Sequence, residues 1–278
     1  MFIIGMNRLG REKQAQVVAA LVEGNSIRAT VRMTGVAKNT IIKLLNDVGR
    51  ACANYQDRVF KNLPCRHVQC DEIWAFCYAK EKNVPDDKKG QFGYVDVWTF
   101  TAICTDTKLV PSSFIRNRDL ESATIFFKDL AGRLANRIQL TTDGHKMYLD
   151  AVESAFGSDI DFSQLVKIYG QTSEGQKRYS PPVCTGTIRP RINGNPENEH
   201  ISTNYVERQN LTMRMNMRRF TRLTNAFSKK VENLAYAVAL HFMYYNFCRI
   251  HQTLRVTPAM EARVTDHVWT IEEILSLF

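Results

Sequence analysis

The sequence lacks an apolar segment long enough to cross a membrane as a helix, which takes about 20 residues. Its most apolar stretch, residues 234–247, is shorter than that and contains His241 and Asn246. Residues 1–6 are too short to form the apolar core of a signal peptide. We therefore expect a protein without membrane contacts that resides in the cytoplasm.

Paired cysteines are also missing. The chain contains 7 cysteines, an odd number, and no Cys-x-x-Cys pair occurs among them. Disulfide frameworks need an even set of cysteines, and many structural zinc sites are built from Cys-x-x-Cys pairs. The spacing therefore predicts neither a disulfide framework nor a zinc site, and it agrees with a reducing cytosol.

What the sequence does have is positive charge, a net +9 over 278 residues, in a chain of otherwise ordinary composition. The net charge is +7 in residues 1–66, −3 in 67–170, +7 in 171–230 and −2 in 231–278. Basic segments suit contacts with a nucleic-acid backbone, whereas an acidic middle suits the binding of metal ions. The alternation predicts DNA-contacting regions on both sides of a metal-binding centre. Solvated charge without a partner is the alternative.

The first basic segment has the pattern of a helix-turn-helix. Apolar spacing and capping residues predict helices over residues 11–22, 26–33 and 37–48. Gly35 stands in the turn between the second and third helices, as this motif often requires. The side chains expected to enter a major groove from the third helix are Lys38, Asn39, Thr40 and Lys43. A three-helix module that binds no DNA is the alternative, and a domain boundary is expected near residue 60.

The acidic middle alternates strand and helix patterns. Apolar and aromatic runs predict strands over residues 66–78, 92–104, 108–116, 137–142 and 165–169. Helical spacing predicts helices over residues 120–136 and 147–156. This order is typical of an α/β sheet with helices on its faces, and an apolar stripe over residues 231–245 is expected to help cover that sheet.

Two aspartates occupy positions where a site can form. Asp71 lies midway along the first strand, where a carboxylate is costly unless it binds something. Asp143 ends the fourth strand, and open sheets build sites at the carboxyl ends of their strands. If these two strands are neighbours, both carboxylates face one metal site. Glu72 follows Asp71 in the same strand and is expected to point to the opposite face.

A third candidate carboxylate follows residues 171–202, a segment without periodicity that is expected to be a long loop or insertion. A helical pattern begins after it, and Glu207, Asn210 and Arg214 share one side of that helix. No basic residue stands three or four positions from Glu207, which argues against a helical ion pair. A plain solvated glutamate is the alternative.

Asp71, Asp143 and Glu207, in this order on this pattern, resemble the DDE triad of RNase H-like transposases and integrases. The segments that carry the resemblance are CDEIWAF around Asp71, LTTDGHKMYLDAV around Asp143 and NYVERQNLTMRMNMRRFTRLTNAFSKK around Glu207. Of the families in this class, the sequence is most similar to the bacterial insertion-sequence-one family. Residues 244–258 also resemble the closing segment of such catalytic domains.

The resemblance implies an α/β fold, with an RNase H-like mixed sheet flanked by helices and preceded by a small all-α helix-turn-helix domain. The corresponding domains are residues 1–60, with the helix-turn-helix and its linker, and residues 61–278, with an insertion at about residues 171–202. It implies a transposase that cleaves the ends of its insertion sequence and joins the 3′-hydroxyl ends to target DNA by metal-dependent phosphoryl transfer.

The implied active site holds two divalent ions. Three converging carboxylates repel one another without cations, and hard oxygen ligands select Mg²⁺ or Mn²⁺. Asp71 is the ligand expected to be shared by both ions, and Asp143 and Glu207 are each expected to complete one side. The basic side chains expected to form a helical ridge along the DNA backbone are Arg214, Arg218, Arg219 and Arg222.

The implied partners are double-stranded DNA, as terminal inverted repeats and as target, and further copies of the chain. Two DNA ends need two active sites, so a homodimer or a larger assembly at the nucleoid is expected. Two other functions stay open from the sequence. One is a DNA-binding repressor that descends from a transposase and no longer catalyses, and the other is an RNase H-like nuclease without strand transfer.

Overall fold

The chain is described from a computed structural model that covers residues 9–170, 183–221 and 225–278. It forms two compact units, which are taken separately below. Unit 1 comprises residues 1–59, 75–96 and 211–278. Unit 2 comprises residues 60–74 and 97–210.

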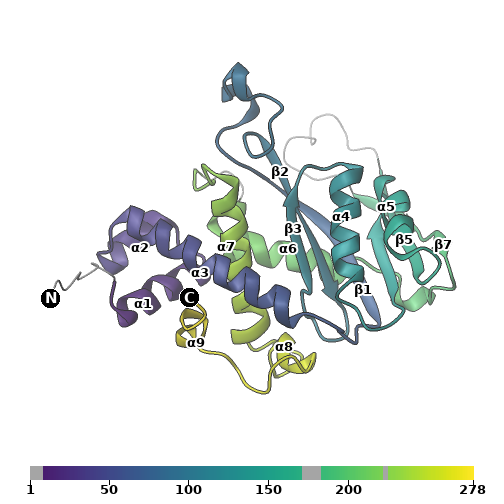
Figure 1. The fold of residues 1–278 in the computed structure, drawn as a ribbon. Helices are drawn as coiled ribbons and strands as arrows, with labels where there is room; N and C mark the ends of the chain where they lie inside the picture. The colour runs from purple at the N-terminus through teal and green to yellow at the C-terminus, as the bar shows by residue number, and fades with distance from the viewer. Residues whose placement is uncertain (1–8, 171–182, 222–224) are drawn as a thin grey trace. The chain divides into compact units, whose positions relative to one another are not determined.

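A mixed sheet forms the centre of unit 2 (Figure 1). Its described strands are β1 (His67–Phe76), β2 (Asp96–Cys104), β3 (Ser112–Arg116), β4 (Gln139–Asp143), β5 (Asp161–Tyr169), β6 (Cys184–Ile188) and β7 (Arg191–Asn193). They follow the order β3-β2-β1-β4-β5-β6, and β7 also pairs with β5. Strands β1, β4 and β5 run parallel, whereas β3, β6 and β7 pair in the antiparallel sense. The predicted α/β sheet is confirmed.

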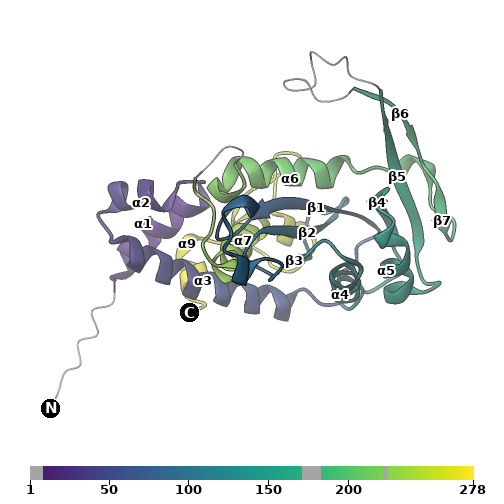
Figure 2. The same cartoon turned by 90° about the horizontal axis from the view of Figure 1, so that it is seen from above.

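Helices α4 (Leu120–Ala131) and α5 (Met147–Phe156) lie on one side of strands β1 to β3, and α6 (Asn204–Asn216) lies on the other (Figure 2). Asp119 caps α4, because its carboxylate accepts the backbone N–H of Ser122 at 2.8 Å. The apolar side of α4 buries Phe126 and Phe127, which pack edge-on at 5.1 Å between ring centroids. Burial of these large side chains against the sheet holds the layers together.

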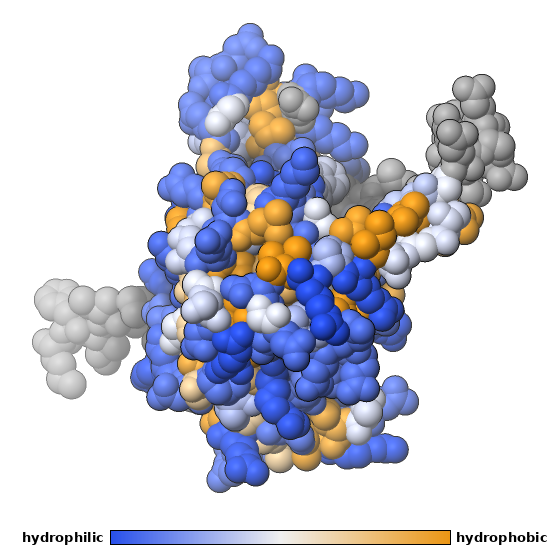
Figure 3. All heavy atoms as spheres, turned by 90° about the vertical axis from the view of Figure 1, so that its right-hand side faces the viewer, coloured by the Kyte–Doolittle hydropathy of each residue, from blue (hydrophilic) through white to orange (hydrophobic). Residues whose placement is uncertain are grey.

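The segment after β5 differs from the expected loop. Part of residues 171–202 lies outside the described residues, but the described part forms β6, β7 and the short helix η3 (Asn198–His200). Strand β6 is half-exposed to fully exposed along its whole length, so it has no alternating apolar pattern that sequence analysis detects. Ile168 and Ile188 of this hairpin are both exposed, and Figure 3 shows apolar surface on this side of the molecule.

Three helices begin unit 1: α1 (Arg11–Val22), α2 (Ile27–Thr34) and α3 (Lys38–Val59). Ser26 caps α2 by accepting the backbone N–H of Ala29 at 3.1 Å. Gly35 ends it in the left-handed region, with φ of 72°, which explains the need for glycine in that turn. The three predicted helices are therefore present, and DNA binding by them stays a prediction. Helix α3 runs eleven residues further than expected, from residue 48 to Val59.

The long α3 explains why the units differ from a division at residue 60 alone. Helix α7 (Val231–Met243) carries the apolar stripe that was expected to cover the sheet, but the stripe packs against α3 within unit 1. Gly49 allows this contact, because a Cβ atom there would lie 2.3 Å from the carbonyl oxygen of Tyr236. Residues 211–278 therefore cluster with the N-terminal helices.

The end of the chain completes unit 1. After α7 come the π-helical turn η5 (Tyr244–Cys248) and two short helices, α8 (Pro258–Glu261) and α9 (Ile271–Leu275). Arg11 donates to the carbonyl oxygen of Leu275 at 2.6 Å, which ties α1 to α9. Within the described ranges, none of the helices is both long and apolar enough to span a membrane.

Candidate active site

The parallel pairing of β1 with β4 brings two of the predicted carboxylates together. Cys70 of β1 lies opposite Thr142 of β4, so the next residues, Asp71 and Asp143, are neighbours across the strand pair. Carboxylate oxygens of Asp71, Glu72 and Asp143 lie within 4.8 Å of one another. The condition set by the sequence, that the first and fourth strands adjoin, is met.

The turn after β4 fixes the direction of Asp143. Its Oδ1 accepts the backbone N–H of His145 at 3.1 Å, and the amide of Gln164 donates to the His145 carbonyl at 3.1 Å. Gly144 passes close to β5, because a Cβ atom there would lie 2.8 Å from Cγ2 of Val166. A larger residue would push this turn away from β5 and move the Asp143 carboxylate.

Glu72 is part of the carboxylate group, which the sequence did not predict. Its side chain is buried on the side of α5, where the hydroxyl of Tyr148 donates to one oxygen and the guanidinium of Arg118 pairs with the other. Arg118 in turn lies over the ring of Trp98, 4.6 Å from its centroid. Strand alternation predicted that Glu72 points away from Asp71, yet its carboxylate lies within 4.8 Å of those of Asp71 and Asp143, close enough for the charges to repel.

Asp71 is the most strongly perturbed acid in this group. Its Oδ1 accepts the backbone N–H of Glu72 at 2.8 Å, and its Oδ2 accepts the side-chain amide of Asn210 at 2.9 Å. Burial raises the pKa of Asp71 to about 7, and the negative charges of Glu72, Asp143 and Glu207 add to this effect despite the backbone hydrogen bond. This carboxyl group holds its charge poorly unless a cation is near.

Helix α6 is anchored to β1 by a buried glutamine. The side-chain oxygen of Gln69 accepts the backbone N–H groups of Tyr205 and Val206, at 2.8 and 3.2 Å. These N–H groups belong to the first turn of α6 and have no partner within the helix. The contact fixes where Glu207 and Asn210 stand along β1. The helical spacing predicts Asn210 on the side of Glu207, but nothing in the sequence indicates its role.

Glu207 forms an ion pair with a lysine and does not lie among the other carboxylates. Its Oε1 accepts Lys167 Nζ at 2.6 Å and the hydroxyl of Thr203. Although partial burial acts in the opposite direction, the bond to Glu207 raises the pKa of Lys167. Glu207 is outside the group of oxygens around Asp71. Lys167 lies on a predicted strand, but its contact with Glu207, 40 residues away, has no signal in the sequence.

The residues present fit a divalent cation. Asp71 and Asp143 offer hard oxygen ligands, which suit Mg²⁺ or Mn²⁺, whereas Tyr148 and Arg118 already occupy both oxygens of Glu72. The side-chain oxygen of Asn210 is buried and has no hydrogen-bond partner among the described residues. A cation beside Asp71 would neutralise the repulsion that raises its pKa, and it would give this orphaned oxygen a partner.

The predicted DNA-contacting residues belong to unit 1. Those at the start of α3 are all exposed: Lys38, Asn39, Thr40 and Lys43. Arg214 lies in the last turn of α6.

The predicted basic ridge is not one continuous helix. Helix α6 ends at Asn216, and η4 (Arg218–Phe220) follows it. Met217 and Phe220 are buried, which turns the chain inward and breaks the helix. Arg219 donates to the hydroxyl of Ser228 at 2.8 Å, and burial lowers its pKa to about 10. Arg218 is exposed, and Arg222 lies outside the described residues.

Comparison with known proteins finds similarity to solved structures but none at the level of sequence. No protein-family model matches the sequence, and no curated protein matches it either. The structure is similar to a piggyBac transposase in a synaptic complex with hairpin DNA, with a TM-score of 0.46 and 10% sequence identity. The match covers 96% of this chain and 70% of that one. The insertion-sequence-one resemblance thus remains a hypothesis drawn from the sequence motifs.

Proposed function

We propose that this chain is a DDE DNA transposase of the insertion-sequence-one type, with an RNase H-like core in unit 2. The observation that carries the proposal is the parallel pairing of β1 with β4, which sets Asp71 beside Asp143. Helix α6, which bears Glu207, contacts the same carboxylate through Asn210. These contacts support a site built from β1, β4 and α6, in which Glu207 is proposed to join Asp71 and Asp143 when metal binds.

Asp71, Asp143 and Glu207 are the proposed ligands of two Mg²⁺ or Mn²⁺ ions. Such ions, when bound, supply a water nucleophile and stabilise the oxygens that attack and leave the phosphorus in an in-line displacement. Asp71 would be the ligand common to both ions, since it lies near Asp143 and contacts Asn210 of α6. Water would break the phosphodiester bond at the end of the element and leave a 3′-hydroxyl and a 5′-phosphate. That hydroxyl would then attack a phosphodiester of the target DNA and displace the 3′-oxygen of the target strand.

The other residues of the site keep these ligands in place. Asn210 fixes one oxygen of Asp71, and the backbone N–H of Glu72 fixes the other. Lys167 holds the charge of Glu207 in the absence of metal and must release it for Glu207 to become a ligand. Gln69 holds the first turn of α6 at a constant position on β1 while that exchange takes place.

DNA binding is assigned to the basic residues outside the sheet. The start of α3 presents Lys38, Asn39, Thr40 and Lys43 for the terminal repeats. Arg214, Arg218, Arg219 and Arg222 are assigned to the DNA backbone, and the partial burial of Arg219 makes it the weakest member of that set. Two DNA ends require two active sites, so the working form is a homodimer or a larger assembly.

A strand-transfer assay tests the proposal directly. Purified protein is incubated with Mg²⁺, a supercoiled target plasmid and labelled DNA that carries the repeats flanking the coding sequence. We expect labelled 3′ ends to become joined to the plasmid, and we expect Asp71→Asn to abolish joining. Asp159→Asn is the matched control, since Asp159 is an exposed aspartate of unit 2 with 80% of its side chain accessible.

Other results of the same assay would indicate a nuclease or a repressor instead of a transposase. Cleaved but unjoined ends would identify a nuclease without strand transfer. DNA that is bound but stays intact with both Mg²⁺ and Mn²⁺ would identify a repressor. Joining that survives Asp71→Asn would show that the assigned carboxylates do not carry the reaction.

A further inference from the structure

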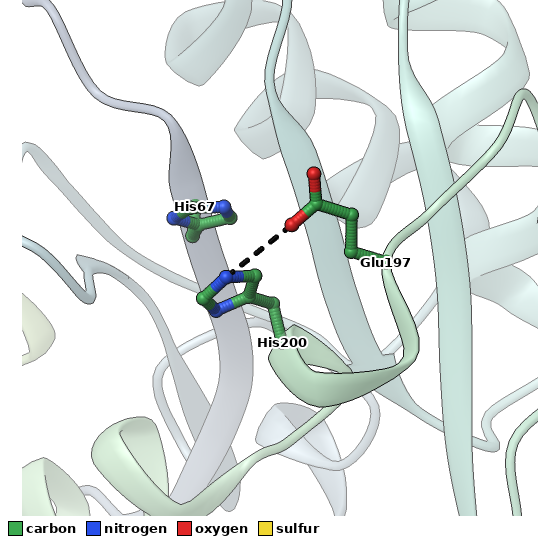
Figure 4. A group of neighbouring side chains, drawn as sticks. All are labelled: His67, Glu197 and His200. Carbon is green, nitrogen blue, oxygen red and sulfur yellow. Dashed lines mark ion pairs between the residues drawn. The ribbon is translucent and has the colours of Figure 1, made fainter.

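A second group of metal-ligating side chains lies on unit 2, built from histidine rather than from carboxylates alone. Its members are His67, Glu197 and His200, shown in Figure 4. His67 is the first residue of β1, whereas Glu197 and His200 stand at the two ends of the turn that contains η3. One ligand atom from each lies within 4.8 Å of the other two. The proposed transposase chemistry makes no use of this cluster.

The donor atoms converge from both segments. Figure 4 shows His67 and His200 with their rings stacked and the Glu197 carboxylate directed at His200. The ring centroids are 3.9 Å apart, and His200 Nε2 lies 3.4 Å from the Glu197 carboxylate. The carboxylate of Glu199 lies 3.5 Å from the same nitrogen. Two imidazoles and one or two carboxylates are therefore available within one small volume.

Asp106 gives His67 the arrangement that metal-bound histidines usually have. Its Oδ1 lies 3.1 Å from His67 Nδ1, which leaves Nε2 as the free donor atom. The other oxygen of Asp106 accepts the backbone N–H groups of Arg66 and His67. A hydrogen bond from Nδ1 to a carboxylate orients the imidazole ring and makes Nε2 a better ligand.

The backbone of the turn is held before any metal binds. Gln139 of β4 lies directly opposite His67 in the sheet register. Its side-chain amide donates to the Glu197 carbonyl at 2.9 Å, and its side-chain oxygen accepts the Glu197 N–H at 2.8 Å. This pair of hydrogen bonds fixes Glu197 beside the start of β1. The stacked rings of His67 and His200 must reorient for both to bind one ion, and the donor atoms already lie within 4.8 Å of one another.

We propose that His67, His200 and Glu197 bind one Zn²⁺ ion. Imidazole nitrogen together with carboxylate oxygen suits zinc, whereas Mg²⁺ prefers oxygen alone. Glu199 or water takes the fourth position of the tetrahedral site. The ion links the start of β1, which leads into Asp71, to the turn that leads into α6. Its role is to hold that turn on the sheet, and the proposal is independent of the proposed transposase activity.

Zinc titration of the metal-free, full-length protein tests the site. A chromophoric chelator competes for the metal, and excess Mg²⁺ keeps zinc from the carboxylates around Asp71. We expect one equivalent of Zn²⁺ per chain. His200→Gln should weaken zinc binding by more than about 100-fold, beyond the usual effect of losing an outer-shell partner. Asp71→Asn should leave zinc binding unchanged.

His267→Gln is the matched control. This exposed histidine also contacts two carboxylates, Asp266 and Glu273, but through opposite ring nitrogens, so they do not share one donor atom. The variant should keep full zinc affinity.

Amide hydrogen exchange distinguishes metal binding from stacking of His67 on His200 without metal. Zn²⁺ should slow amide hydrogen exchange in residues 196–204 of the wild-type chain and of Asp71→Asn, but not of His200→Gln. Circular dichroism checks that each variant is folded. The proposal is overturned if the wild-type chain binds no zinc under these conditions, or if His200→Gln and wild type bind it equally. It is also overturned if zinc binds without slowing exchange in this turn.

Discussion

Two clusters of polar side chains stand on the same strand and differ in almost every physical respect. His67 and Asp71 are four residues apart on β1, which corresponds to about 13 Å along an extended strand. The cluster around Asp71 is acidic and largely buried, and it includes a carboxyl group whose pKa is raised to about 7. The cluster around His67 is more exposed and combines two imidazole rings with the carboxylate of Glu197.

The two clusters differ in how much they destabilise the fold when no metal is bound. Three close carboxylates destabilise the fold unless cations or protons neutralise them, so such a group is retained for chemistry rather than for stability. A histidine cluster costs little without metal, and a bound ion adds stability to the segment that it links. Hard oxygen and imidazole donors also select different ions, so the two sites can be loaded and tested independently.

The largest expected effect belongs to Asp71→Asn. The substitution keeps the shape of the side chain but removes the charge that two ions are proposed to share. Mg²⁺-dependent strand joining should fall by at least about 10³-fold, the equivalent of several kcal/mol of lost stabilisation. Gel assays of labelled DNA measure the joining, and zinc titration of the same sample should be unchanged. If this variant loses affinity for both Mg²⁺ and Zn²⁺, the two clusters act as one metal site rather than two.

Glu72→Gln tests whether Glu72 stabilises the fold or binds metal as Asp71 and Asp143 are proposed to do. Glu72 has a side chain that is only 1% exposed and pairs with Arg118, so loss of its charge leaves that guanidinium without a full partner. We expect the free energy of unfolding to fall by about 2–3 kcal/mol, near the low end for a broken buried pair. Urea unfolding measures the loss, and Mg²⁺ titration should show little change. If the variant is stable but loses Mg²⁺ affinity, Glu72 is itself a metal ligand.

The comparison also shows what could be read from the sequence. Asp71 and Asp143 were found because the periodicity of each strand is a local signal in the sequence. The sequence prediction required their strands to be neighbours, and the parallel pairing of β1 with β4 meets that condition. The His67–His200 contact joins residues 133 positions apart, with no spacing rule for a histidine and glutamate site. The exclusion of a zinc site rested on cysteine spacing, and such spacing says nothing about ligands that only the sheet register brings together.

Other differences have the same origin. Strand β6 was missed because both of its faces are exposed. The second half of α3 was not joined to the third predicted helix, because its polar sequence is typical of either a linker or a short connecting helix. The basic ridge beyond Asn216 was predicted from helical spacing alone, whereas the burial of Phe220 redirects the chain. Periodicity reports which face of an element is buried, but not where tertiary packing ends the element.

Asp106→Asn sharpens the histidine side of the comparison. An asparagine can still accept a hydrogen bond from His67 but carries no charge to strengthen Nε2 as a ligand. We expect zinc affinity to fall by about 10- to 100-fold, with Mg²⁺ affinity unchanged. Chelator competition measures the first and isothermal calorimetry the second. Equal zinc affinity in the variant and the wild type would show that Asp106 has no part in the site.

The smallest expected effect belongs to Lys167→Met, which tests whether Glu207 joins the acidic cluster. Lys167 and Glu207 are 31% and 40% exposed, so their ion pair contributes about 1 kcal/mol or less. Removing the lysine frees Glu207 for metal and removes a competing charge, so Mg²⁺ affinity should rise by about three- to fivefold. Lys128→Met, an exposed change on α4, is the control for net charge. If Lys167→Met leaves Mg²⁺ affinity unchanged or lowers it, Glu207 is a partner of Lys167 and not a ligand, and the acidic cluster consists of Asp71, Glu72 and Asp143 alone.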